Sequence, residues 1–146
     1  MDKSGKKKVM VFGTFDIFHP GHRSFLRQAR KFGDYLIVVV ARDKTVKVFK
    51  KQDTKNKEQA RMRMIQKSAL ADEVVLGGLG DKYAIIKKHK PDVICLGYDQ
   101  KFFIEELEEK LREFELDKTE IFRLKAYKSE IYKSSKLKNK LFLVDI

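Results

Sequence analysis

Runs of apolar residues alternate along this chain with stretches in which apolar side chains recur at helical spacing. The expected strands are residues 9–12, 35–41, 73–76, 93–96 and 119–124, of which 9–12, 35–41 and 93–96 are unbroken apolar runs. The helical stretches are residues 24–32, 58–70, 82–90 and 102–114. Strands that are apolar on both faces are typical of a parallel sheet covered by helices. The pattern predicts an α/β fold, an open parallel sheet of about five strands with helices on both faces.

Two stretches break this alternation. Residues 42–57 carry seven basic and two acidic side chains with almost no periodicity, so we expect a long mobile loop. Loops of this length inside compact domains are usually functional lids or disordered, and both interpretations stay open here. Residues 125–133 form a polar connector before a final helix over 134–142. Because no repeat or linker divides the chain, we expect one domain over residues 1–146, with residues 1–7 as a flexible tail.

The composition indicates where in the cell such a protein would be found. Hydrophobic residues make up 42% of the chain, and no apolar run approaches the roughly 18 residues that a membrane span needs. The N-terminus is basic but lacks the apolar segment of a signal peptide. The single cysteine, Cys95, excludes a disulfide within the chain and a multi-cysteine metal site. We therefore expect a cytoplasmic protein without a membrane partner.

The charge balance indicates an anionic partner. The chain has 33 basic and 21 acidic side chains and a net charge of +12. Such an excess favours binding to a polyanion, which is either nucleic acid or a small phosphorylated ligand. Charge alone leaves both classes open.

The turn after the first strand carries the strongest chemical signal. It reads Gly13, Thr14, Phe15, Asp16, and the next residues include His19, Pro20, Gly21 and His22. A glycine turn between a parallel strand and a helix is a phosphate site in α/β proteins, because backbone N–H groups point outward and the helix dipole adds about half a positive charge. Two histidines three residues apart would donate to the same anion as its charge grows in a transition state.

The two histidines have two other possible interpretations. A zinc site would need a third His or Cys, and none lies near in the sequence, so we expect no metal ligands from the protein. The pair would otherwise serve only as polar caps of the helix. The neighbouring Gly13, Thr14 and Gly21 favour the phosphate site.

The fourth strand ends in a similar turn, Gly97-Tyr98-Asp99. In doubly wound sheets the ligand lies where the strand order reverses. If the first and fourth strands flank that reversal, Gly13 and Gly97 open onto one crevice, although Gly97 alone is equally compatible with an ordinary turn.

Residues late in the chain would face the same crevice. Arg123 ends the fifth strand and Tyr127 follows closely. Ser134 and Ser135 begin the final helix, where serine is a good N-cap but also offers hydroxyl groups to a second anion.

Cations in the middle of the chain would complete a phosphate site. The lysines of residues 42–57 would close on phosphates as flexible point charges, although a solvated charge run is their usual meaning. Arg61 would clamp a phosphate with two parallel hydrogen bonds. Since the chain shows no Ser-His-Asp or reactive-Cys arrangement, we expect the site to stabilise charge on phosphorus without a covalent intermediate.

Gly13-Thr14-Phe15-Asp16 with His19-Pro20-Gly21-His22 resembles the HxGH nucleotidyltransferase superfamily, also called cytidylyltransferase-like. The likeness continues through Ala41-Arg42-Asp43, Arg61, Leu96-Gly97-Tyr98-Asp99-Gln100, Arg123, Tyr127 and Ser134-Ser135. It implies a Rossmann-like sheet and transfer of a nucleotidyl group from ATP or CTP to a phosphate acceptor, with release of pyrophosphate. The chain most resembles the short archaeal-type FAD synthases, which adenylylate FMN.

The resemblance also implies roles for particular residues. The catalytic residues would be His19, His22, Lys47 and Lys51. The nucleotide would be bound by Gly13, Thr14, Phe15, His19, Pro20, Gly21, His22, Gly97, Asp99, Arg123, Tyr127, Ser134 and Ser135. Asp16, Asp43 and Arg61 would contact the substrate.

The partners implied are ATP with Mg²⁺ or another divalent cation, and FMN or another small phosphorylated acceptor. Relatives are often dimers, which leaves a homodimer open. One alternative is a cytidylyltransferase using CTP and a small polyol phosphate such as glycerol 3-phosphate, a family that usually has a tighter spacing than Arg123 to Ser134. Another is a nucleic-acid-binding module, which the lack of interleaved aromatic residues in the basic stretch does not favour.

Overall fold

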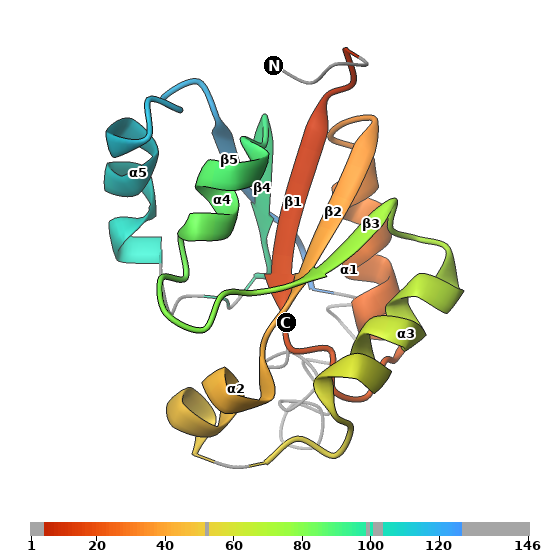
Figure 1. The fold of residues 1–146 in the computed structure, drawn as a ribbon. Helices are drawn as coiled ribbons and strands as arrows, with labels where there is room; N and C mark the ends of the chain where they lie inside the picture. The colour runs from red at the N-terminus through yellow and green to blue at the C-terminus, as the bar shows by residue number, and fades with distance from the viewer. Residues whose placement is uncertain (1–4, 52, 99, 101–103, 127–146) are drawn as a thin grey trace.

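The fold is a five-stranded parallel sheet covered by helices, seen in a computed structural model that describes residues 5–51, 53–98, 100 and 104–126 (Figure 1). The strands are β1 Lys8–Gly13, β2 Tyr35–Val40, β3 Glu73–Leu76, β4 Val93–Leu96 and β5 Glu120–Arg123. The helices are α1 Pro20–Arg30, α2 Asp43–Lys50, α3 Glu58–Ser68, α4 Ala84–His89 and α5 Ile104–Glu113. The predicted fold class is therefore confirmed.

The strand order β3-β2-β1-β4-β5 places β1 at the centre of the sheet. The register pairs Val11 with Val38 of β2 on one side and with Cys95 of β4 on the other. The chain moves outward from β1 through β2 and β3, then returns to the other side of β1 for β4 and β5. The strand order thus reverses between β1 and β4, which is where ligands bind in sheets of this kind.

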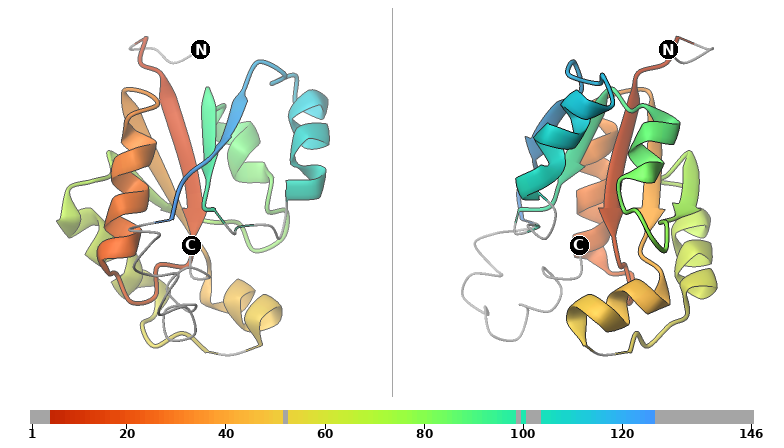
Figure 2. Two further views of the ribbon diagram at one scale, coloured as in Figure 1. Left: turned by 180° about the vertical axis from the view of Figure 1, so that it is seen from behind. Right: turned by 60° about the vertical axis from the view of Figure 1, so that its left-hand side comes forward.

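The side chains of the strands separate into two cores, one on each face of the sheet. Val9 and Val11 pack with α1 and α3, whereas Met10 and Phe12 pack with α4 and α5. Figure 2 shows the same division, with α1 on the face opposite α4 and α5. Burial of both faces explains why the central strands read as unbroken apolar runs.

The expected mobile loop over residues 42–57 is wrong for its first half, because Asp43–Lys50 is helix α2. Val46 is buried and anchors this helix, while Lys44 and Lys47 on its other faces are exposed. The N–H of Asp43 donates to the carboxylate of Glu58, at 2.8 Å. With eight residues, the helix is too short to show a clear periodicity of apolar side chains. Part of its stability comes from Glu58, which lies fifteen positions away in the sequence.

Other boundaries differ by smaller amounts. The first helix begins at Pro20, four residues before the expected start, because His19 and Pro20 form its cap and first turn. Within the expected tail, the N–H of Lys7 donates to Asp34. The final helix expected over 134–142 lies outside the described residues. No helix in the described ranges combines the length and apolar character that crossing a membrane requires.

Candidate active site

His19 forms the N-cap of α1, at the carboxyl end of the central strand. Its backbone is extended, and its Nδ1 accepts from the backbone N–H groups of Gly21, at 3.1 Å, and His22, at 3.4 Å. These bonds satisfy donors that the first turn of a helix cannot pair within itself. An Nδ1 that accepts carries no proton, so the ring proton of neutral His19 lies on Nε2.

The imidazole rings of His19 and His22 stack with centroids 3.7 Å apart. Both side chains are buried, and Phe15 meets the His22 ring edge-on at 5.2 Å while Phe18 lies parallel to it at 5.8 Å. The two histidines are therefore brought together, as the sequence predicts, and His19 is also the helix cap that was weighed as the alternative. Capping and a role in chemistry are compatible in this residue.

Two glycines make this packing possible. A Cβ at Gly13 would lie 2.6 Å from Cε2 of Phe15, and a Cβ at Gly21 would lie 2.9 Å from Cε1 of His19. Phe15 itself has a positive φ of 53°, which bends the chain so that its ring turns back under the histidines. The Gly13–His22 turn is thus a packed unit.

The turn after β4 forms the other side of the strand reversal. Gln100 donates from Nε2 to the carbonyl of Phe12 on β1, at 3.0 Å, and its Oε1 accepts from the N–H of Gly97. Arg123 holds the same turn, because its Nη1 donates to the carbonyls of Gly97, Tyr98 and Gln100. The two glycine turns are therefore joined directly, as expected if β1 and β4 flank the reversal.

Gln100 is a residue whose role the sequence does not reveal. It is a buried amide that links two strand ends, yet it stands in a polar turn in the sequence. No pattern in the sequence indicates that Gln100 is buried, although a buried polar side chain needs partners and the strand ends beside it supply them.

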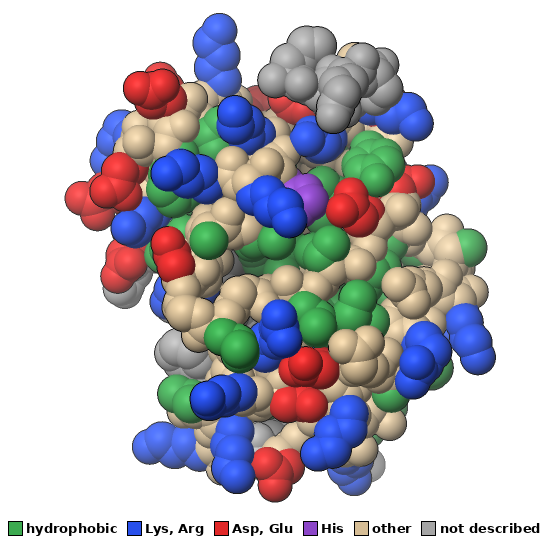
Figure 3. All heavy atoms as spheres, in the orientation of Figure 1, with side chains coloured by type: hydrophobic (Ala, Val, Ile, Leu, Met, Phe, Trp, Pro, Cys, Tyr) green, Lys and Arg blue, Asp and Glu red, His purple; other side chains and the backbone are tan. Residues whose placement is uncertain are grey.

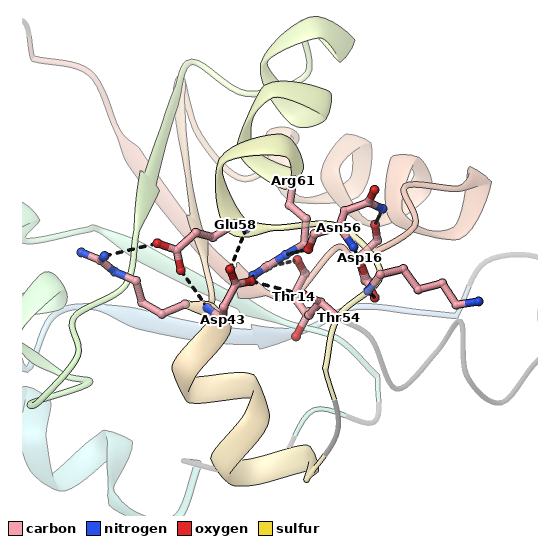
Figure 4. Close-up of polar contacts among 9 residues, drawn as sticks. Thr14, Asp16, Asp43, Thr54, Asn56, Glu58 and Arg61 are labelled. Carbon is pink, nitrogen blue, oxygen red and sulfur yellow. Dashed lines mark hydrogen bonds and ion pairs between the residues drawn. The ribbon is translucent and has the colours of Figure 1, made fainter.

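The three residues expected to contact substrate belong to one hydrogen-bonded network beside the histidine turn (Figure 4). Arg61 is fully buried and donates to Asp43 Oδ1, to the carbonyl of Thr14 and to the carbonyl of Asn56. Asp16 accepts from the N–H groups of Lys55 and Asn56. The guanidinium of Arg61 thus faces inward, toward protein acceptors.

Electrostatics keeps Asp43 ionised within this network. Burial alone would raise the pKa of its carboxyl group, but hydrogen bonds from Arg61, the N–H of Glu58 and the hydroxyl of Thr54 together lower that pKa below 3.8. The carboxylate therefore balances the buried guanidinium.

The two lysines expected to act over the site belong to α2 and its end. Lys47 is exposed and lies 3.9 Å from Asp53, and Lys51 is the C-cap of α2 in a left-handed conformation. Helix α2 lies beyond the carboxyl ends of the strands (Figure 1). The cations thus stand on a helix at the same end of the sheet as the histidines.

Four expected nucleotide contacts, Asp99, Tyr127, Ser134 and Ser135, lie outside the described residues. Among the residues that are described, no group of three His, Cys, Asp or Glu side chains is arranged to hold a metal ion.

Comparison with known proteins agrees with this geometry. The sequence profile of the family described as cytidylyltransferase-like matches residues 10–140, from the central strand onward. The chain belongs to the cytidylyltransferase-like family. The expected relation to HxGH nucleotidyltransferases, and with it the enzyme class, is confirmed.

Relatives of this cytidylyltransferase-like chain include two proteins named FAD synthase. That of Aciduliprofundum boonei is 48% identical over 82% of this chain and 79% of its own length. That of Ferroglobus placidus is 46% identical over 90% and 85%. A crystal structure of a lipopolysaccharide core biosynthesis protein from Thermoplasma volcanium is 38% identical, with a TM-score of 0.78 over 84% of this chain and 99% of that one.

Proposed function

We propose that this chain is an FMN adenylyltransferase that transfers AMP from ATP to FMN and releases FAD and pyrophosphate. The observation that carries the proposal is the stacked pair His19 and His22, held at the N-terminus of α1 where the strand order reverses. Such a site suits nucleotidyl transfer, and the two relatives named FAD synthase favour FMN as the acceptor.

The proposed reaction needs no strong general base. The phosphate monoester of FMN is largely ionised at neutral pH, because its second pKa is about 6. One of its oxygens attacks the α-phosphorus of ATP, and the bond from that phosphorus to the bridging oxygen of pyrophosphate breaks. The protein has to align these groups and stabilise the negative charge that grows on the phosphate oxygens.

The described residues are suited to that task. The first turn of α1 supplies the positive end of the helix dipole, and His19 would donate its Nε2–H. Lys47 and Lys51, on α2 and at its end, would bring mobile positive charge to the phosphates. His22, packed against His19, would donate to the same triphosphate.

The adenine and ribose would lie on the β4 side of the reversal. At Gly97 the lack of a side chain would let the nucleotide approach the main chain closely, and Arg123 and Gln100 hold that turn in place. By resemblance, Asp99 and Tyr127 would contact the nucleoside, and Ser134 and Ser135 the outer phosphates.

Mg²⁺ fits this proposal without a dedicated protein site. Mg²⁺ is bound chiefly by substrate phosphates and water, with one or two carboxylates at most. The absence of a metal-binding cluster among the described residues is compatible with that mode. When bound with ATP, Mg²⁺ would neutralise charge on the phosphates. A cytoplasmic location and a homodimer stay predictions.

The decisive experiment offers the purified chain ATP or CTP with Mg²⁺ and either FMN or glycerol 3-phosphate. Pyrophosphate release and the products are measured by chromatography. We expect FAD from ATP and FMN at a rate at least tenfold above every other combination. Faster turnover of CTP with glycerol 3-phosphate would instead identify the cytidylyltransferase alternative.

A nucleic-acid-binding module would behave differently in the same assay. It would release no pyrophosphate with any pair and would bind duplex with a steep dependence on salt. On the face shown in Figure 3, basic side chains are scattered among acidic ones and form no continuous stripe. That distribution does not favour a track for nucleic acid on this face.

A further inference from the structure

The side chain of Arg61 is the largest fully buried side chain in the described part of the molecule. A buried charge is costly unless it is paired and its hydrogen-bond donors are used. Its Nη2 donates to Asp43 Oδ1 at 2.7 Å, its Nη1 to the carbonyl of Thr14 at 2.8 Å, and its Nε to the carbonyl of Asn56 at 3.0 Å. Each of the three nitrogen atoms of the guanidinium therefore donates a hydrogen bond to the protein.

The three acceptors belong to three different segments. Thr14 lies in the turn between β1 and the histidines, Asp43 begins α2, and Asn56 lies in the connection from α2 to α3. A planar guanidinium with donors in fixed directions can hold three such segments in one arrangement, which a lysine cannot do. Figure 4 shows these segments converging on Arg61.

A second set of bonds joins the same turn to the same connection. The carboxylate of Asp16 accepts from Lys55 N at 2.8 Å and from Asn56 N at 2.9 Å. In return, Asn56 Nδ2 donates to the carbonyl of Asp16 at 2.6 Å. The residues on either side of Phe15 are thus both fixed, Thr14 by Arg61 of α3 and Asp16 by the α2–α3 connection.

Helix α2 is held from the opposite side by a reciprocal pair. The N–H of Asp43 donates to Glu58, and the N–H of Glu58 donates to Asp43, at 2.8 and 3.2 Å. Because Asp43 also accepts from Arg61, the start of α2 is fixed to α3 and to the histidine turn together. Lys47 stands one turn further along α2.

We propose that Arg61 is a positioning residue, which fixes the carbonyl of Thr14 and the start of α2 and so sets the histidine turn against the lysines of α2. The proposal rests on the proposed nucleotidyl transfer. It assigns to Arg61 a role through Thr14 and Asp43, in place of direct contact with a phosphate. The reason for that choice is that Nε, Nη1 and Nη2 of Arg61 each already donate to an acceptor of the protein.

The test compares R61K and R61M with R63K and R63M. Arg63 lies on the same helix but is exposed, so its variants control for a changed charge on α3. We expect kcat of R61K to fall by about 10- to 100-fold while KM for ATP stays within threefold, because misplacement of the reacting groups lowers turnover. Circular dichroism and the Tm show whether each variant is folded at the assay temperature. The Arg63 variants should keep the kcat of the unchanged protein.

A double-mutant cycle separates positioning from general destabilisation. R61K and D43N remove parts of one network, so the double variant should lose little more kcat than the worse single variant. R63K combined with D43N should lose the product of its two single effects. Multiplicative losses for R61K with D43N, or a kcat of R61K within twofold of the unchanged protein, would overturn the proposal.

One measurement does not depend on the reaction. The carbonyl of Thr14 and the N–H of Phe15 belong to the same peptide group, so the amide resonance of Phe15 reports the bond from Arg61. We expect that resonance to shift in R61K and to stay in place in R63K. If the unchanged protein makes no FAD, the proposed function fails, but the shift of the Phe15 resonance still tests whether Arg61 fixes the turn. An unshifted Phe15 resonance in folded R61K rejects the positioning role.

Discussion

His19 combines a structural and a chemical task in one ring. Its Nδ1 caps α1, which fixes the plane of the imidazole and places the ring proton on Nε2. The sequence predicts the pair His19 and His22 because their spacing at a glycine turn is unusual. From the sequence, capping is only the alternative to a role in chemistry, since Ser, Thr, Asp and Asn are the residues usually found at an N-cap.

Substitution of Gly21 by alanine tests this double task. Alanine is favoured over glycine within a helix by about 1 kcal/mol, but the new Cβ would lie 2.9 Å from Cε1 of His19. The ring of His19 can rotate away, which costs the cap about 1 kcal/mol. We therefore expect a Tm within a few degrees of the unchanged protein and a kcat reduced at least tenfold.

Gly80→Ala is the matched control for that substitution, because a Cβ at Gly80 meets nothing within 4 Å. Its kcat and Tm should both match those of the unchanged protein. Full activity of Gly21→Ala would show that the orientation of His19 does not matter to turnover.

Helix α2 shows where interpretation of the sequence fails at the level of elements. The strands and the longer helices are predictable because each buries its own apolar residues at a regular period. Helix α2 is short, buries Val46, and is stabilised at its start by Glu58 and Asp43 across two helices. The bonds that define it connect residues distant in sequence, so a local pattern cannot reveal them.

Asp43→Asn tests how much of this arrangement depends on charge. The carboxyl pKa of folded Asp43 is lowered, so its ionised form contributes stability above pH 3.8 that is lost as the pH falls through the still lower folded pKa. We expect the variant to lose about 2 kcal/mol of unfolding free energy at pH 7, from a weakened bond to a charged partner. In urea titrations between pH 7 and pH 2, the difference from the unchanged protein should shrink at the acid end.

Asp53→Asn serves as the control, because Asp53 is exposed and its contact with Lys47 is 3.9 Å long. Its unfolding free energy should change by less than about 0.5 kcal/mol. A difference for Asp43→Asn that is the same at both ends of the pH range would mean that the carboxylate charge has no part in holding α2.

At the scale of the whole molecule, the order of the strands in the sheet brings the residues of the site together. Gly13 and Gly97 are more than eighty residues apart, yet they end neighbouring strands because the order reverses between β1 and β4. Sequence periodicity gives the strands and the similar turns, and the resemblance to a known family supplies their order. The bond from Gln100 to Phe12, which joins the two turns, emerges only from the folded chain.

Cys95 offers a measurement of how this central sheet opens and of what binds to it. It is fully buried in β4 beside β1, and burial raises the pKa of its thiol to about 12. A thiol reagent at pH 8 should therefore modify Cys95 only when the sheet opens. Gln59→Cys in a Cys95→Ala background places a thiol on an exposed position and should react at once. Equal rates for the two would contradict the burial of Cys95.

The same reaction ranks the nucleotides without any turnover. A ligand that binds only the folded protein lowers the open population by a factor of 1 + [L]/Kd, so about 100 Kd of ligand should slow the modification of Cys95 by about 100-fold. We expect ATP to slow it more than CTP at equal concentration, and neither to slow the exposed Gln59→Cys. Stronger protection by CTP would favour the cytidylyltransferase alternative. In either case the nucleotide would bind beyond the carboxyl ends of β1 and β4, and would so stabilise the strands that must part before the thiol is exposed.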